Sequence, residues 1–206
     1  FHGWRSTYVS LAGLSLAIMM PLAFWLKAKL NAESNAHADH ISRERLAKTK
    51  MSPNQVTLLL GIAGIACCVA MSMPQVHIVA YCVDLGFGAV VGAEMLSLML
   101  LGGVLSRVIS GVLADRLGGV KTLLIGSVLQ CLGLIFYLPS SSMMSLYAIS
   151  LMFGLAQGGI VPSYALIVRE YLPGHEAGSR VGAVLMTTIL GMALGGWMSG
   201  WIYVKT

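Results

Sequence analysis

A single arginine lies deep inside an otherwise uncharged stretch of the sequence. Arg107 carries the only charge between Glu94 and Asp115, and it precedes Asp115 by eight residues. That spacing is about 12 Å along a helix, which rises about 1.5 Å per residue. Placing a guanidinium so deep in an apolar layer costs about 2.5–3.5 kcal/mol. The side chain could contact an anionic ligand, or it could be a structural arginine that reaches the end of the layer or pairs with another part of the protein. Small residues share its helical face and leave room beside it: Gly103, Ser110, Gly111 and Ala114.

Two opposite charges follow Arg107 in a glycine-rich turn, Gly111-Val-Leu-Ala-Asp115-Arg116-Leu-Gly118-Gly119-Val-Lys121. The glycines permit a tight reversal of the chain. An acidic group at a helix end can accept hydrogen bonds from the N-terminus of a neighbouring helix and can pair with a basic side chain. Such contacts predict a latch that is broken when the helices slide past one another. The alternative is an ordinary solvated turn.

Four further side chains in apolar runs could contact a ligand. His77 and Tyr81 lie four residues apart and share a helical face. Because histidine changes its charge near neutral pH, His77 could relay protons or hydrogen-bond a ligand. The alternative is a packed, hydrogen-bonded histidine, and both interpretations stay open. Gln157 and Tyr164 share one face of a later run and could line a cavity.

Several other features do not indicate chemistry. The glycines of Gly86-x-Gly88-x-x-x-Gly92 have the wrong last spacing for a dinucleotide-binding loop, and no acidic ribose ligand follows them. His37-x-x-His40 lacks further metal ligands, and the four cysteines, all in apolar stretches, predict neither a disulfide framework nor a zinc site. We interpret Glu94 and Gln130 as structural or boundary residues. The sequence predicts no cofactor, no metal site and no enzyme active site.

The elements that must position these residues are unusually apolar. Of the 206 residues, 57% are hydrophobic and 10% are charged, and the mean hydropathy is +0.81; soluble domains carry about 25% charged residues. No charge occurs at residues 51–83, 122–168 or 181–204, and a helix that crosses a bilayer needs about 20 apolar residues. The composition predicts an all-α, polytopic membrane protein in the lipid bilayer. It excludes a soluble enzyme, and basic residues confined to one segment and short turns indicate no nucleic-acid partner.

We predict six membrane-spanning helices, at residues 6–26, 56–83, 89–114, 120–138, 143–168 and 181–203. Pro162 is expected to bend the fifth of them. Small residues let helices approach closely in lipid, and the clearest pairs are Gly191 with Gly195 and Gly196 with Gly200.

Basic residues occur in alternate connections between these spans. Six Lys and Arg residues lie in the polar segment 27–55, and the turns after the third and fifth spans carry Arg116 with Lys121 and Arg169 with Arg180. The intervening turns, 84–88 and 139–142, contain no Lys or Arg. Because basic connections stay in the cytoplasm, the sequence predicts a multi-pass protein with the three basic segments inside.

The turn that contains Gly111, Asp115, Arg116, Gly118 and Lys121 resembles the loop signature of the major facilitator superfamily of secondary transporters. The resemblance implies a bundle of twelve helices in two halves, of which this chain holds helices 6 to 11. Residues 1–26 would then be the last helix of the N-terminal half, 27–55 the central cytoplasmic loop, and 56–206 the C-terminal half without helix 12. It also implies that these five residues form the latch and that transport proceeds by alternating access.

The segment from Ser106 to Asp115 looks like helix 8 of the monocarboxylate-porter and oxalate/formate-antiporter branch of that family, in which the arginine matching Arg107 binds the substrate carboxylate. The segment around His77 and Tyr81 is similar to the end of helix 7 in bacterial members of the branch. The resemblance implies a small organic anion as substrate, a proton or counter-substrate as the driving partner, and a bacterial inner membrane as the location. A broad-specificity exporter is the alternative within transport; a non-transporting scaffold or an intramembrane enzyme is the alternative outside it.

Overall fold

The computed structural model describes residues 4–25 and 32–205, and every regular element among them is an α-helix. The predicted all-α class is therefore confirmed. The helices are α1 (Trp4–Trp25), α2 (Ala32–Thr49), α3 (Pro53–Asp84), α4 (Ala89–Leu117), α5 (Gly119–Tyr137), α6 (Met143–Gln157), α7 (Ile160–Tyr171) and α8 (Gly174–Lys205). They fall into two compact units, Phe1–His37 and Ala38–Thr206.

The first unit contains the apolar helix α1. Its 22 residues would extend about 33 Å, which matches the roughly 30 Å hydrocarbon core of a bilayer. Its side chains from Arg5 to Trp25 are exposed, as expected for a helix surrounded by lipid or by further helices. The predicted span 6–26 agrees with this helix, except that Leu26 lies outside the described residues.

Six helical segments in the described ranges are long and apolar enough to cross a membrane, which confirms the six predicted spans. The second starts at Pro53, three residues before its prediction, because Ser52 and Gln55 form a capping box. The Ser52 hydroxyl accepts the Gln55 N–H at 3.3 Å, and the Gln55 side chain accepts the Ser52 N–H at 2.8 Å. The third continues to Leu117, where Gly118 adopts a positive φ of 86° that ends the helix.

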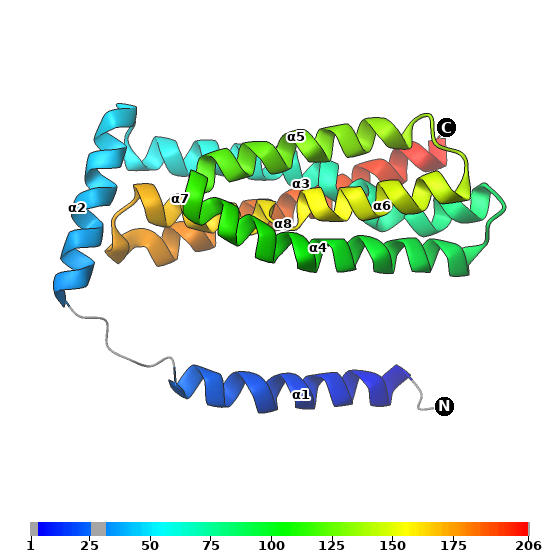
Figure 1. Cartoon of the computed structure of the whole chain (residues 1–206), viewed down its shortest axis with the longest axis horizontal. Coiled ribbons are helices and arrows are strands. Elements are labelled where there is room, and N and C mark those ends of the chain that lie inside the picture. The colour runs from blue at the N-terminus through cyan, green and yellow to red at the C-terminus, as the bar shows by residue number, and fades with distance from the viewer. Residues whose placement is uncertain (1–3, 26–31, 206) are drawn as a thin grey trace. The chain divides into compact units, whose positions relative to one another are not determined.

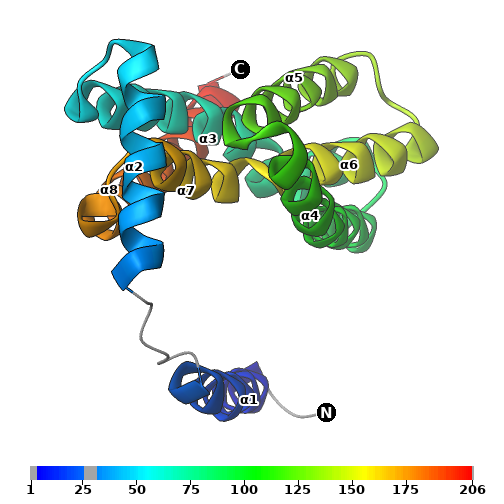
Figure 2. The same ribbon diagram turned by 60° about the vertical axis from the view of Figure 1, so that its left-hand side comes forward.

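The polar segment 27–55 contains a helix, α2, although residues 27–31 with Lys27 and Lys29 lie outside the described ranges. From Ala38 onward α2 belongs to the second unit and lies crosswise at one end of its helices (Figures 1 and 2). The Asp39 carboxylate accepts the N–H of Gly174 at 2.7 Å. This contact supplies an acceptor for the first turn of α8, which helps that helix to begin seven residues before its prediction.

The second unit is a bundle in which α3 pairs with α8, α4 pairs with α6, and α5 packs against α6 and α7 (Figure 1). Glycines of α8 allow α3 and α8 to approach each other closely. A Cβ atom on Gly191 would lie 2.6 Å from the Ile65 carbonyl oxygen, and one on Gly195 would overlap the α3 backbone. The predicted close packing is thus confirmed for this glycine pair. Gly196 and Gly200 instead leave ordinary van der Waals distances of 3.6 Å to α3.

The fifth span is interrupted at Gly158 and Gly159, between the end of α6 at Gln157 and the start of α7 at Ile160. Pro162 explains the interruption. A proline has no N–H to donate to the carbonyl four residues earlier, here that of Gly158, and its ring would clash with that carbonyl in a continuous helix. Where the sequence predicts a bend at Pro162, the structure has an interruption of the helix one turn before the proline.

The two ends of the bundle differ in their connections. We call the end that holds α2 and the turns after α4 and α7 the basic end, and the end that holds turns 85–88 and 138–142 the opposite end (Figure 1). One core cluster, with Tyr164 and Val184, lies between α3, α5, α7 and α8. A second, with Ile78, Met95 and Leu146, lies between α3, α4 and α6.

Candidate functional site

Arg107 lies on an exposed face of α4. On the same helix Ser106 and Ala114 are buried. Gly111, one turn after Arg107, faces open space. No hydrogen bond or ion pair joins the guanidinium to another residue in ranges 4–25 and 32–205. All five N–H donors of a guanidinium are therefore available to a group from outside the described chain.

The buried side-chain amide of Gln157 lies at the interruption of the fifth span, at about the same height along the bundle as Arg107. The backbone of Gly158 packs against α4 at Ser106, and the preceding residue, Gln157, accepts a hydrogen bond from the Gln75 side chain of α3 at 3.0 Å. Two amides thus join α3 to α6 beside the helix that carries the arginine. Sequence reasoning did not single out Gln75; its signal is an amide that directly follows a proline in an apolar run.

His77 contacts α8 rather than Arg107. Its Nε2 lies 2.8 Å from the Ser199 hydroxyl, and that hydroxyl donates to the Gly195 carbonyl at 2.6 Å. Because the serine hydrogen is used in this way, Nε2–H is the donor to Ser199, and Nδ1 is the nitrogen that can accept a proton. The ring also stacks on Tyr203, with centroids 6.0 Å apart.

The remaining predicted contacts lie elsewhere in the bundle. The Tyr81 hydroxyl donates to the Ser140 carbonyl at 3.2 Å, at the opposite end. Tyr164 is 1% exposed and packs in the core cluster with Val184. The structure therefore brings Arg107 and Gln157 to adjoining helices at one level, and it places His77, Tyr81 and Tyr164 in three other environments.

The glycine-rich turn of the predicted latch joins α4 to α5 at the basic end. Gly118 occupies the left-handed region between the two helices, and Asp115, Arg116 and Lys121 have exposed side chains. These three make no hydrogen bond or ion pair with the part of the chain that the structure describes. The latch contacts stay a prediction.

Glu170 performs within the bundle the role that was predicted for an acid of the turn. Both of its carboxylate oxygens lie 3.2 Å from the Gly119 N–H, at the start of α5. One of them also lies 3.8 Å from the Arg45 guanidinium of α2. We call Arg45, Glu170 and the Gly119 N–H the basic-end clasp. Sequence reasoning missed Glu170, whose signal is an acid directly after Arg169 at the end of the fifth span.

The described residues contain no group of three or more His, Cys, Asp or Glu side chains that could hold a metal ion.

The sequence matches the Major Facilitator Superfamily over residues 1–196. It is 27% identical to "Monocarboxylate transporter 13" of Bos taurus over 132 residues, which are 63% of this chain and 31% of that protein. It is 28% identical over 130 residues to "Probable anion transporter 2, chloroplastic" of Oryza sativa subsp. japonica, covering 62% of this chain and 24% of that one. It is 33% identical over 106 residues to "Probable anion transporter 5" of Arabidopsis thaliana, covering 50% and 24%.

The chain spans less than a third of the length of each of these relatives. No solved structure matches it. The family whose model matches is a family of transporters, and these relatives are named as transporters. With six apolar helices and a match over nearly its whole length, the chain belongs to the Major Facilitator Superfamily and is a partial helix bundle of a multi-pass membrane protein.

Proposed function

We propose that this protein is a secondary active transporter that carries a small organic anion, such as a monocarboxylate, by alternating access. The observation that supports this most directly is the guanidinium of Arg107, which lies on a membrane-spanning helix and has no partner in the described ranges. The planar fork of an arginine matches a carboxylate with two parallel hydrogen bonds. The names of the relatives, monocarboxylate and anion transporters, agree with such a substrate.

The other candidate residues have different roles in this proposal. Gln157, together with Gln75, supplies amide groups beside the helix interruption. His77 is the group that takes up a proton on Nδ1 when transport is proton-coupled, and a counter-substrate is the other possible driving partner. Tyr81 and Tyr164 contact substrate only in a conformation that releases them from their present neighbours, Ser140 and the core cluster.

The proposed orientation places the basic end in the cytoplasm and the protein in a plasma membrane, the inner membrane of a bacterium. The excess of Lys and Arg at the basic end supports this orientation. In the same proposal α1 is the last helix of the N-terminal half, 27–55 is the central loop, and α3 to α8 form helices 7 to 11.

Substitutions of Arg107 test the anion site in the full-length protein. Arg107→Lys keeps the charge but loses the planar fork, so we expect carboxylate binding at equilibrium to weaken about tenfold or more, corresponding to about 1.4 kcal/mol. Arg107→Ala should nearly abolish binding. Arg43→Ala is the matched control, because it removes the same charge from an exposed position on α2 that lies in neither the anion site nor the latch, and it should leave binding unchanged.

Thermal unfolding of the same variants separates binding from folding. If Arg107 pairs with an acid elsewhere in the protein, the alanine variant loses stability and neutralising that acid restores it. Wild-type carboxylate binding by a stably folded Arg107→Ala variant would refute the anion site and favour a broad-specificity exporter.

The proposed latch of Gly111, Asp115, Arg116, Gly118 and Lys121 has its own test. Asp115→Asn should lower the transport rate of the full-length protein while leaving expression and stability unchanged, because the exposed carboxylate has no contact to lose within the described bundle. Accessibility probes should show fewer molecules closed at the basic end. An unchanged rate and an unchanged conformer ratio would reduce the motif to a solvated turn.

A further inference from the structure

A groove of about 240 Å³ lies between α4 and α5. The two helices separate from their shared turn at Gly118, and α6 lies between them further along (Figures 1 and 2). The interruption of the fifth span closes the inner side of the groove. A Cβ atom on Gly159 would overlap the Ser110 side chain of α4, and one on Gly126 of α5 would lie 2.9 Å from Ile160. We call this the basic-end groove, because it leads toward the turn between α4 and α5.

The walls of the basic-end groove are apolar. None of the residues that line it is charged, and two of its hydroxyls, those of Ser110 and Thr122, donate to carbonyls of their own helices at 2.6 and 3.0 Å. Its larger aliphatic side chains come from three helices, and all of them except Leu113 are exposed: Ile109, Leu113, Ile125, Leu129 and Leu155. The wall on α5, from Thr122 to Leu129, extends about 10 Å along the helix. An elongated apolar groove on the surface of membrane-spanning helices suits a hydrocarbon chain.

Two cations stand where this groove reaches the basic end. Residues three or four apart are neighbours on a helix surface. Arg116 follows the groove residue Leu113 by three positions, and Lys121 precedes the groove residue Ile125 by four. Both basic side chains are exposed, and neither has a hydrogen bond or ion pair with another residue in ranges 4–25 and 32–205. Their charges are therefore available to an anion at the mouth of the groove.

Two acids lie at the same end, but neither occupies this mouth. Asp115 follows Leu113 by two positions, so it faces another direction from α4. The Glu170 carboxylate accepts the Gly119 N–H and lies 3.8 Å from the Arg45 guanidinium. The mouth of the basic-end groove is therefore positively charged.

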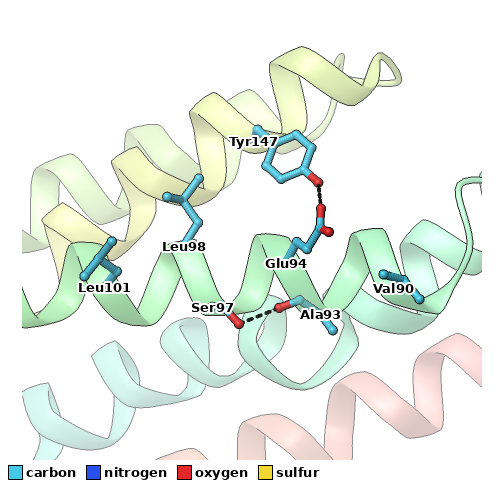
Figure 3. A pocket seen from close by; sticks show the side chains of 7 residues that line it. All are labelled: Val90, Ala93, Glu94, Ser97, Leu98, Leu101 and Tyr147. Atoms are coloured by element: carbon cyan, nitrogen blue, oxygen red, sulfur yellow. Dashed lines mark hydrogen bonds between the residues drawn. The ribbon is translucent and has the colours of Figure 1, made fainter.

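A groove at the opposite end shows that charge, rather than apolar surface, distinguishes the basic-end groove. It has a volume of about 510 Å³ and lies between α4 and α6, with Leu98 and Leu101 in its wall. Its lining holds no Lys or Arg but one acid, Glu94, whose carboxylate accepts the Tyr147 hydroxyl across the gap (Figure 3). Both grooves could hold a hydrocarbon chain, but only the basic-end groove suits one that is attached to an anionic group.

We infer that the basic-end groove binds an anionic phospholipid, with one acyl chain between α4 and α5 and the phosphate paired with Arg116 and Lys121. Basic side chains at a membrane surface attract anionic lipids, and the fork of an arginine pairs with two phosphate oxygens. Asp115 of the same turn takes no part in this site. The inference goes beyond the proposed transport function, because lipid binding needs neither the anion site at Arg107 nor a change of conformation.

The test measures lipid binding to the purified full-length protein in detergent by native mass spectrometry. The two probes are dioleoyl phosphatidylglycerol, which is anionic, and dioleoyl phosphatidylcholine, which has the same chains without a net charge. The wild-type protein should prefer phosphatidylglycerol. Because each cation contributes to the attraction, the double variant Arg116→Ala with Lys121→Ala should bind phosphatidylglycerol about tenfold more weakly or less still. Ile125→Trp, whose larger side chain fills the groove, should lose the same binding.

Each variant has a matched control. Arg43→Ala with Lys48→Ala removes two exposed cations from α2 at the same end, and Leu124→Trp adds the same ring at the neighbouring exposed position of α5 outside the groove. Both controls should bind phosphatidylglycerol as the wild type does. Thermal unfolding without added lipid identifies variants that do not fold. Ile109→Trp fills the groove from α4 and takes the place of Ile125→Trp if that variant is unstable.

Three results would overturn the inference. The first is equal binding of the two lipids by the wild-type protein, and the second is wild-type phosphatidylglycerol binding by the double variant. The third is unchanged phosphatidylglycerol binding by the groove-filling variant together with a lowered melting temperature, which would show that another segment of the full-length protein covers the groove. No step measures transport, so failure of the anion site at Arg107 would leave this result unaffected.

Discussion

The basic end and the opposite end of the bundle are held together by different chemistry. At the basic end, carboxylates from distant parts of the chain accept the first N–H groups of helices: Glu170 binds Gly119 of α5, and Asp39 binds Gly174 of α8. At the opposite end α6 starts with its own Ser142, whose hydroxyl accepts the Ser145 N–H at 3.3 Å. α4 starts at a glycine without any side-chain cap.

The comparison shows where the helices depend on one another. A helix N-terminus carries a partial positive charge, which a carboxylate stabilises. When that carboxylate belongs to another helix, the contact lasts only while the two helices keep their relative position. The basic end is therefore tied together by contacts that sliding of α2, α5 and α7 would break. The helix starts at the opposite end do not depend on such movements, and tyrosine hydroxyls join the helices there.

Chemical labelling gives the largest expected effect, because it reads which end faces which side of the membrane. In a background without the native cysteines, Ser141→Cys at the opposite end should react fully with an impermeant thiol reagent added outside. Ser179→Cys near the basic end should not react. Both positions are exposed. Gly119, also at the basic end, is not a suitable position for an introduced cysteine, because a Cβ atom there would lie 2.8 Å from Ile167. The reverse pattern of labelling would overturn the orientation.

Breaking the basic-end clasp should have the next largest effect, which is a loss of unfolding free energy. Glu170→Gln removes a charged acceptor whose side chain is 18% exposed, and hydrogen bonds to charged groups contribute about 1.5–3 kcal/mol. We expect the free energy of unfolding of the purified protein to fall by about that amount. Glu44→Gln is the matched control at the same end, because its side chain is 62% exposed beside an exposed His40 and exposed ion pairs contribute about 0–1 kcal/mol. Equal losses in the two variants would contradict a special role for the clasp.

A neutral contact at the opposite end should give the smallest effect. Tyr137→Phe removes a hydroxyl that lies 2.9 Å from Ser150 of α6. A neutral hydrogen bond contributes about 0.5–1.5 kcal/mol, so the loss of unfolding free energy should be smaller than for Glu170→Gln. If thermal or denaturant unfolding ranked the two variants in the opposite order, the distinction between the ends would fail.

Hydropathy and charge were sufficient to predict the six spans. A membrane-spanning segment can be recognised from sequence because each apolar side chain adds to the hydropathy of the segment, whatever its neighbours in space. The effect of Pro162 on the fifth span is equally local, since the proline acts on the carbonyl of Gly158 four residues before it. The signature at Gly111 to Lys121 placed the chain in its family for the same reason, because a turn motif is read from consecutive residues.

The polar contacts between helices were decided only by the tertiary structure. The sequence indicated Asp115 as an acceptor for a helix N-terminus, whereas in the bundle Glu170 takes the N–H of Gly119. It gave no sign that Glu94 would meet Tyr147, or that Gln75 would meet Gln157. Such pairs depend on how far each helix is rotated and shifted against its neighbour. Those displacements are set by close backbone contacts at glycines such as Gly154 and Gly191, between residues far apart in the sequence, and no local pattern of apolar and polar residues specifies them.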